Sequence, residues 1–170
     1  MPRHSSILTW TLLSICSFTT QAQTVYTGDG TFYSPSVGLG SCGQQYQDTD
    51  LVAALAEVSM QAYNPGNPNN NPLCGYKVNV WNNANPSTTV TVTIVDTCPG
   101  CQGQYDLDLS PAAFNQLADP SVGRIQISWE FAEAFSLTTG PFAGAVPGER
   151  VAINQKVISN PEVAASRDEL

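Results

Sequence analysis

Apolar and polar residues alternate along several short stretches of the chain, and this period of two predicts β-strands. The predicted strands are 24–33, 76–81, 89–95 and 123–131. The first is predicted from its content of Thr, Val, Tyr and Phe, with Gly28-Asp29-Gly30 as a break or bulge, and the other three from their alternation. In the last strand the alternation predicts Ile125, Ile127, Trp129 and Phe131 pointing inward and Gln126, Ser128 and Glu130 pointing outward. Trp81, in the second strand, is assigned to the core together with Trp129.

One short helix is predicted beside these strands. Ser110 is a good N-cap and Pro111 suits the first helical position, while Asp119 and the proline after it end the helix. Residues 51–60 are apolar but contain few β-branched side chains, so a strand and a helix both remain open there. Short strands, one helix and loops rich in Asn, Pro and Gly predict a small closed β-barrel. Residues 132–170 show no sustained period and are predicted to form a low-order tail.

The N-terminus has the three-part layout of a secretory signal peptide. Arg3 and His4 precede an apolar run from 7 to 18, and Ala22 ends a small-residue cleavage site. We therefore expect residues 1–22 to be removed and the protein to be secreted. The apolar run is too short to span a bilayer, and no later segment predicts a membrane anchor.

Charge and composition narrow the function classes. The chain carries 14 acidic and 6 basic residues, a net charge of -8, which argues against a nucleic-acid binder. Cleavage after Ala22 would remove the single histidine, which excludes Ser-His-Asp and Cys-His catalysis and any His-based zinc site. No metal or cofactor is predicted, and a monomer is expected. The length of 170 residues suits one domain with a core, placed at 23–131.

Four cysteines remain after the predicted cleavage, and an even number in a secreted domain indicates two disulfides with three possible pairings. Cys98 and Cys101 form a Cys-Pro-Gly-Cys motif. A redox site would place this motif at a helix N-terminus, whereas a glycine- and glutamine-rich loop follows it. A zinc site would need a second close cysteine pair, but Cys42 and Cys74 are far apart in the sequence. A structural disulfide is favoured over both alternatives.

Two aspartates flank this motif and are the candidates for chemistry. Asp96 ends the strand before Cys98, and Asp108 precedes the predicted helix, so both carboxylates can face one groove. Glycoside chemistry needs such a pair, a proton donor and a base or nucleophile. Structural alternatives remain open for both: Asp108 can support the helix start, and Asp96 can accept hydrogen bonds from the turn backbone. Tyr46, Tyr63 and Tyr105 lie in predicted loops and are candidates for stacking on a sugar ring.

The order and spacing of several motifs resemble the first domain of expansins and the related barwin and RlpA-like double-psi β-barrels. Single-domain fungal expansin-like proteins, the loosenins, look most similar. The motifs that carry the resemblance are Gly30-Thr31-Phe32-Tyr33, Ser41-Cys42-Gly43, Cys74-Gly75 and the segments 95–101, 108–114 and 123–129. Together they cover about 25–131, and in combination they are specific.

This resemblance implies a mainly β fold, a six-stranded double-psi β-barrel with one or two short helices and an open polysaccharide groove. It implies loosening of cell-wall polysaccharide, cellulose or chitin, without hydrolysis or with weak lytic activity at most. The family's key acid corresponds to Asp108, its second groove aspartate to Asp96, and the strand residues beside them to Thr31 and Tyr33. The family spacing also implies the pairs Cys42–Cys74 and Cys98–Cys101.

The chain departs from the family pattern at three points. Cys98 stands where bacterial expansins have a groove tyrosine, the His-Phe-Asp motif of plant expansins is missing, and no second carbohydrate-binding domain is recognisable. A secreted protein-binding module, such as a cysteine-protease inhibitor or a plant-interacting effector, is therefore the alternative function. The ending Arg167-Asp168-Glu169-Leu170 resembles an endoplasmic-reticulum retrieval signal, which would keep the protein from the medium.

Overall fold

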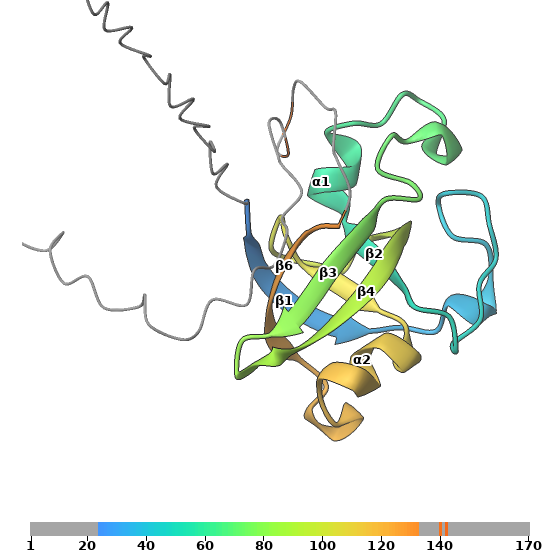
Figure 1. Cartoon of the computed structure of the whole chain (residues 1–170). Helices are drawn as coiled ribbons and strands as arrows, with labels where there is room; N and C mark the ends of the chain where they lie inside the picture. Colours follow the sequence, from blue (N-terminus) through green and yellow to red (C-terminus); the bar gives the residue numbers. More distant parts are fainter. Residues whose placement is uncertain (1–23, 133–139, 141, 143–170) are drawn as a thin grey trace, which may run out of the picture.

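The computed structural model describes residues 24–132, 140 and 142, and its centre is a closed six-stranded β-barrel (Figure 1). The strands are β1 (Tyr26–Phe32), β2 (Val52–Ala56), β3 (Lys77–Asn82), β4 (Asn85–Cys98), β5 (Leu107–Leu109) and β6 (Ile125–Phe131). Around the barrel they follow the order β1-β5-β2-β4-β3-β6. The β1–β5 and β2–β4 pairs are parallel and the other four are antiparallel. The predicted closed barrel is therefore confirmed.

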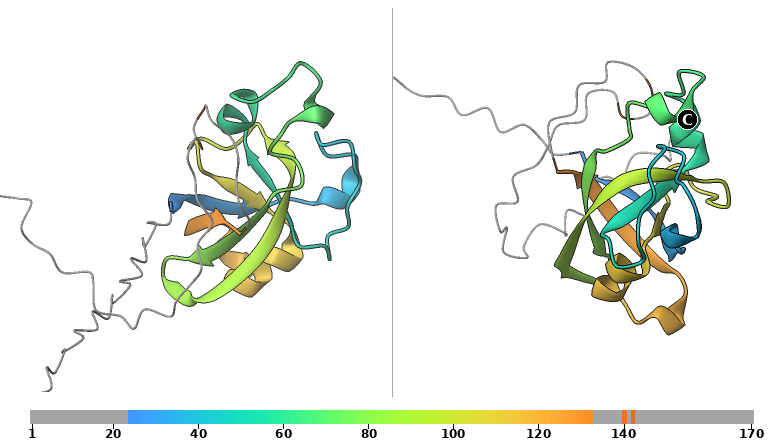
Figure 2. Two further views of the ribbon diagram at one scale, coloured as in Figure 1. Left: turned by 45° about the horizontal axis from the view of Figure 1, so that its top comes forward. Right: turned by 90° about the vertical axis from the view of Figure 1, so that its right-hand side faces the viewer.

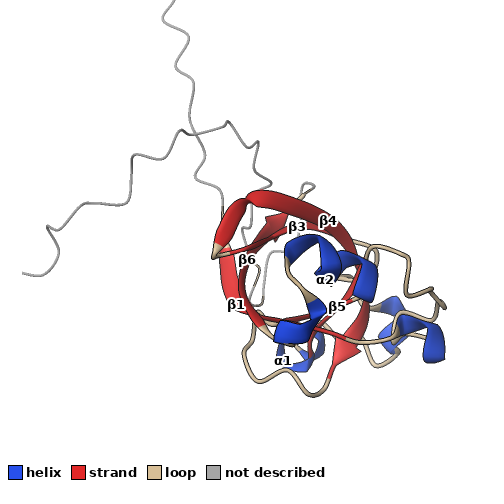
Figure 3. Ribbon diagram, turned by 90° about the horizontal axis from the view of Figure 1, so that it is seen from below, coloured by secondary structure: helices blue, strands red, loops and turns tan. Residues whose placement is uncertain are grey.

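Two short α-helices, α1 (Glu57–Gln61) and α2 (Pro111–Leu117), pack on this barrel. Helix α2 lies across one end of the barrel, which is visible when the molecule is viewed along its axis (Figure 3). Phe114 and Leu117 on this helix join the core. Ser110 is the predicted N-cap, because its Oγ accepts a hydrogen bond from the Ala113 amide at 3.3 Å. Residues 51–60 contain both predicted alternatives, since β2 runs directly into α1.

Three 3-10 turns lie in the connecting segments: η1 (Pro35–Val37), η2 (Pro68–Asn70) and η3 (Pro120–Val122). The segment that holds η1 and the segment that holds η2 lie next to each other along one side of the barrel (Figure 2). The Cys42–Cys74 disulfide joins them, with 5.7 Å between the Cα atoms. The second disulfide joins Cys98 to Cys101, so the pairing implied by the family spacing is confirmed.

Two assignments of side chains to faces need correction. Trp81 lies half-buried on the outer face of β3, because Val78 and Val80 already occupy the alternate, inward positions. Ser128 and Glu130, predicted to face solvent, are both buried. Alternation predicts the direction in which a side chain points, but it does not predict whether the outer face is covered.

The core also receives a side chain from beyond the predicted end of the domain. Phe142 is fully buried, and its ring lies 5.0 Å from that of Tyr26 and 5.3 Å from that of Phe131, centroid to centroid. Its backbone N–H donates to the Tyr63 hydroxyl at 2.8 Å. The segment predicted to be a low-order tail thus contributes to the packed interior. The expected leader 1–22 and the ending 167–170 lie outside the described residues.

Candidate functional site

Four side chains form one continuous row on the outer face of the barrel, one from each of four neighbouring strands. Thr31 of β1 is the register partner of Asp108 of β5, and Asp108 is also the partner of Ala54 of β2. Ala54 is in turn the partner of Asp96 of β4. Side chains paired in this way point to the same face of the sheet. Sheet pairing therefore brings together Asp96, Asp108 and Thr31, as the sequence analysis expects of one groove.

A β-bulge in β4 is what turns Asp96 to this face. Ala53 pairs with Ile94, but the next residue, Ala54, pairs with Asp96, so Val95 is the extra residue. Without this extra residue the alternation that buries Ile94 would direct Asp96 into the core. The bulge also fixes the neighbouring loop, since the Val95 carbonyl accepts a hydrogen bond from the Cys42 amide at 3.3 Å.

Asp108 is the group best prepared to donate a proton. It is half-buried, and burial raises the pKa of its carboxyl above the ordinary value of 3.8. A hydrogen bond from the Thr31 hydroxyl to Oδ1, at 2.6 Å, and the charge of Arg124 partly offset this rise. Asp108 lies outside helix α2 and its carboxyl is hydrogen-bonded to Thr31, which argues against a role limited to the helix start.

Asp96 is one of the four residues in the row, and its carboxyl also binds the backbone of neighbouring segments. Its Oδ1 accepts hydrogen bonds from the Ser41 amide at 2.7 Å and from the Thr97 amide at 2.8 Å. These bonds hold the 34–50 loop against the end of β4. The structural alternative for Asp96 is thus partly correct: it does bind turn backbone, although on one oxygen only. The other oxygen, Oδ2, has no hydrogen-bond partner among the described residues.

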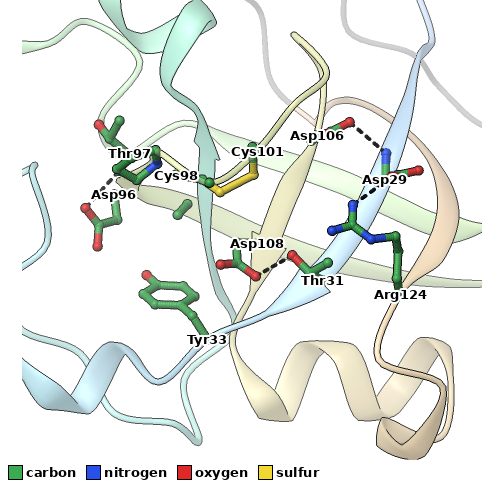
Figure 4. A pocket seen from close by; sticks show the side chains of 13 residues that line it. Asp29, Thr31, Tyr33, Asp96, Thr97, Cys98, Cys101, Asp106, Asp108 and Arg124 are labelled. Atoms are coloured by element: carbon green, nitrogen blue, oxygen red, sulfur yellow. Dashed lines mark hydrogen bonds and ion pairs between the residues drawn. A yellow bond between two sulfur atoms is a disulfide. The ribbon is translucent and has the colours of Figure 1, made fainter.

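Tyr33 follows β1 and places its ring between the two aspartates (Figure 4). Its hydroxyl is buried and, within the described part of the chain, is the single buried side-chain polar atom without a hydrogen-bond partner. Burial raises the pKa of Tyr33 well above its ordinary value of 10.0, and the charges of Asp96 and Asp108 raise it further. The hydroxyl therefore stays protonated and is available as a hydrogen-bond donor.

These groups line a cavity of about 250 Å³. The Cys98–Cys101 loop forms one wall, and Asp29, Asp106 and Arg124 form the far end (Figure 4). Asp29 pairs with Arg124 at 2.7 Å and also accepts a hydrogen bond from the Gln126 side chain. Asp106 is buried and accepts from the Asp29 and Gly103 amides, at 2.8 and 2.7 Å, so it fixes the loop that precedes β5.

Three residues that line the cavity, Asp29, Asp106 and Arg124, were not predicted from the sequence. Asp106 lies just before β5 and is separated from Asp108 by a single leucine, a spacing that puts both carboxylates on one side of an extended segment. No sequence signal brings Asp29 and Arg124 together, because they are 95 positions apart and meet only through the β1–β6 pairing.

The predicted stacking tyrosines do not line this cavity. The ring of Tyr105 lies 5.0 Å from that of Tyr26, and its backbone carbonyl accepts a hydrogen bond from the Trp129 indole at 2.8 Å. Tyr63 stacks on Phe142, with 6.1 Å between ring centroids. Tyr46 is half-buried in the 34–50 loop.

The described residues contain no group of three or more His, Cys, Asp or Glu side chains arranged to hold a metal ion. Within the same residues, no helix has the length and apolar character needed to cross a membrane.

Comparison with known proteins adds the family context. Residues 22–129 match the model of a double-psi β-barrel family described as lytic transglycolase. An EG45-like domain containing protein of Citrus jambhiri is 33% identical over 135 residues, which is 74% of this chain and 95% of the relative.

Two solved structures share the fold. The Streptomyces papain inhibitor has 34% sequence identity and a TM-score of 0.56, over 65% of this chain and 96% of its own. A mutant expansin of Clavibacter michiganensis, solved in complex with cellohexaose, has 28% identity and a TM-score of 0.51 over 69% of this chain. The match spans 54% of that expansin's length.

Proposed function

Since the chain belongs to the RlpA-like double-psi β-barrel family, we propose that it is a secreted protein that binds a cell-wall polysaccharide in the cavity of Asp96, Asp108 and Tyr33 and loosens it. One observation carries the proposal: Tyr33, whose buried hydroxyl has no hydrogen-bond partner among the described residues, lines an open cavity between two carboxylates. Hydroxyl-rich sugars offer donors and acceptors to all three groups. The related expansin's complex with cellohexaose supports the same ligand class.

Asp108 is the group through which loosening would act. Burial raises the pKa of Asp108, so its carboxyl keeps a proton to a higher pH than an exposed aspartate does, and Thr31 fixes the direction of this carboxyl. A protonated Asp108 can donate to a glycan oxygen and so compete with the hydrogen bonds between neighbouring chains of the polymer. Cleavage would need this proton donor together with a positioned base or nucleophile. Asp96 is the second acid, but one of its oxygens is held by two backbone amides. We therefore propose loosening without net cleavage.

A three-part assay on the secreted protein tests this function. Pull-down on insoluble cellulose and chitin measures binding, weakening of filter paper or isolated walls measures loosening, and release of reducing ends measures cleavage. We expect wild type to bind and weaken the polymer with no rise in reducing ends. Asp108→Asn should lose the weakening, whereas Glu57→Gln, which removes an exposed carboxylate from α1, should retain it. Equal weakening by both variants would overturn the role of Asp108, and a rise in reducing ends would show a lytic enzyme.

A second candidate function, inhibition of a cysteine protease, is favoured by a separate feature. The 34–50 loop exposes Val37 and Leu39 at 87% and 72%, the highest exposed fractions of any large apolar side chains in the described residues. The loop is held by the Cys42–Cys74 disulfide and by a bridge between Leu39 and Gln45. A preorganised apolar loop loses little entropy on binding a protein. The similarity to the Streptomyces papain inhibitor points to the same partner class.

The two functions use different surfaces and can be separated. A papain inhibition assay with wild type and Leu39→Asp tests the loop, and the polysaccharide pull-down of the same variant serves as its control. Inhibition that is lost in Leu39→Asp while pull-down persists would establish the inhibitor function. Absence of inhibition by wild type at micromolar concentration would reject it.

A further inference from the structure

The walls of the cavity carry a strong excess of negative charge. Its lining contains four carboxylates, from Asp29, Asp96, Asp106 and Asp108, against the single guanidinium of Arg124. Lys77 on β3 is the only other Lys or Arg within residues 24–132. A cavity with low-dielectric walls and one sign of charge concentrates ligands of the opposite sign.

The four carboxylates differ in how many of their oxygens already accept hydrogen bonds or ion pairs from the protein. Both oxygens of Asp106 accept backbone amides, and Asp29 is paired with Arg124. Asp96 and Asp108 are each engaged through Oδ1, while their Oδ2 atoms have no hydrogen-bond partner among the described residues. The excess charge available to a ligand is therefore concentrated at these two residues.

Their spacing suits a group that lies between them. Asp96 and Asp108 are on β4 and β5, and only Ala54 of β2 stands between them in the row. Strands are about 4.8 Å apart, so the two backbones are roughly 10 Å apart. The small methyl of Ala54 leaves the space above it open, and the Tyr33 hydroxyl borders this space.

We propose that this cavity selects a polysaccharide with protonated amino groups, the glucosamine units of partly deacetylated chitin, over the neutral chains of cellulose and fully acetylated chitin. The inference rests on the proposed function and names its substrate class. An ammonium held between Asp96 and Asp108 forms charge-assisted hydrogen bonds with their Oδ2 atoms. A neutral hydroxyl or acetamido group at the same sugar position can form hydrogen bonds with these oxygens, but it lacks the attraction between opposite charges. Asp106, which is committed to the backbone, contributes only its charge.

Three β-1,4-linked hexamers provide a matched test, because they differ only in the group on carbon 2. Cellohexaose carries a hydroxyl, chitohexaose an acetamido group, and the glucosamine hexamer an ammonium at pH 5.5. Titration calorimetry of the folded protein at low ionic strength gives each dissociation constant. We expect the glucosamine hexamer to bind about tenfold more tightly than cellohexaose. The ratio should shrink above about 0.15 M salt, where the Debye length is about 8 Å or less.

Variants separate the cavity from the general attraction of an acidic protein for a polycation. Asp96→Asn retains an oxygen for the Ser41 and Thr97 amides but loses the charge, and Asp108→Asn does the same toward Thr31. In each variant we expect the glucosamine hexamer to bind less than about threefold more tightly than cellohexaose. Glu57→Gln, which removes one exposed charge outside the cavity, should keep the preference of wild type.

Equal affinities of wild type for the glucosamine hexamer and cellohexaose would overturn the inference and leave the proposed function intact. A preference that persists unchanged in both cavity variants would also overturn it, because the attraction would then come from the overall charge. Binding of none of the three hexamers would remove the proposed function itself.

Discussion

Tyr33→Phe is the substitution that separates a functional hydroxyl from a structural one. The change removes a single oxygen and keeps the ring that packs between Asp96 and Asp108. That oxygen is buried and has no hydrogen-bond partner in the part of the chain that the structure describes. Because burial raises the pKa of Tyr33, the hydroxyl is neutral throughout the working pH range, and no loss of charge accompanies the substitution.

The expected magnitude follows from the missing partner. A buried polar group left unpaired costs about 1–3 kcal/mol of stability. Replacing the hydroxyl by hydrogen should therefore raise the free energy of unfolding by about 1 kcal/mol, which is roughly 3–6 °C in Tm for a domain of this size. If the hydroxyl donates to a sugar oxygen in the complex, its loss should weaken binding about 3- to 10-fold.

Tyr63→Phe is the matched control, because it is the same chemical change at a hydroxyl that has a partner. The Tyr63 hydroxyl accepts the Phe142 amide at 2.8 Å and does not line the cavity. Its loss should lower the free energy of unfolding by about 0.5–1.5 kcal/mol and leave ligand binding unchanged. Thermal unfolding by circular dichroism gives the stability of each variant, and calorimetric titration with the hexamers gives its affinity.

We therefore predict that the free energy of unfolding rises in Tyr33→Phe and falls in Tyr63→Phe. If Tyr33→Phe loses stability as Tyr63→Phe does, the Tyr33 hydroxyl makes a stabilising hydrogen bond in solution. The reasoning that it is left unpaired for a ligand would then be refuted. If Tyr33→Phe gains stability but binds every ligand as tightly as wild type, the hydroxyl does not contact the bound chain.

Three further predictions address the charge, the core and the covalent links. Asp108→Asn should abolish loosening without loss of stability at neutral pH. Because folding raises the Asp108 pKa, wild type should gain stability relative to the variant as pH falls through that pKa towards 3.8, which unfolding titrations at several pH values can measure. Phe142→Ala should cost about 3–5 kcal/mol in denaturant unfolding, because the ring is fully buried; a change under 1 kcal/mol would show that 132–170 is dispensable. Replacing Cys42 and Cys74 by serine opens a cross-link 32 positions long and should cost about 3–4 kcal/mol in the same assay.

Strands were predictable where the sequence alternates or is rich in β-branched and aromatic residues. β3, β6 and residues 90–94 of β4 were recognised because alternate positions there are apolar, and β1 was recognised from its threonine and aromatic residues. β2 is buried at all five positions and so shows no alternation, which left a helix open. β5 has only three residues, fewer than any pattern can establish, and it forms because β1 and β2 pair with it on either side.

The candidate site was likewise predictable only in part. The local motifs around Asp96 and Asp108 were visible in the sequence, and the resemblance to expansins added Thr31 and Tyr33. The row that joins these residues depends on the pairing of β1, β5, β2 and β4 and on the bulge at Val95, neither of which has a local signal. The prediction of three tyrosines as sugar platforms rests only on their position in loops, whereas Tyr105 packs against the aromatic cluster of the core.

The most direct test of the central claim is a nitrogen-15 NMR titration of the folded protein with the glucosamine hexamer and with cellohexaose. If the cavity binds polysaccharide, the largest amide shifts should centre on Thr31, Tyr33, Ala54, Asp96 and Asp108, and they should saturate at lower concentrations of the glucosamine hexamer. Shifts confined to the 34–50 loop, or no shift with either hexamer, would contradict the assignment of this row as the binding groove.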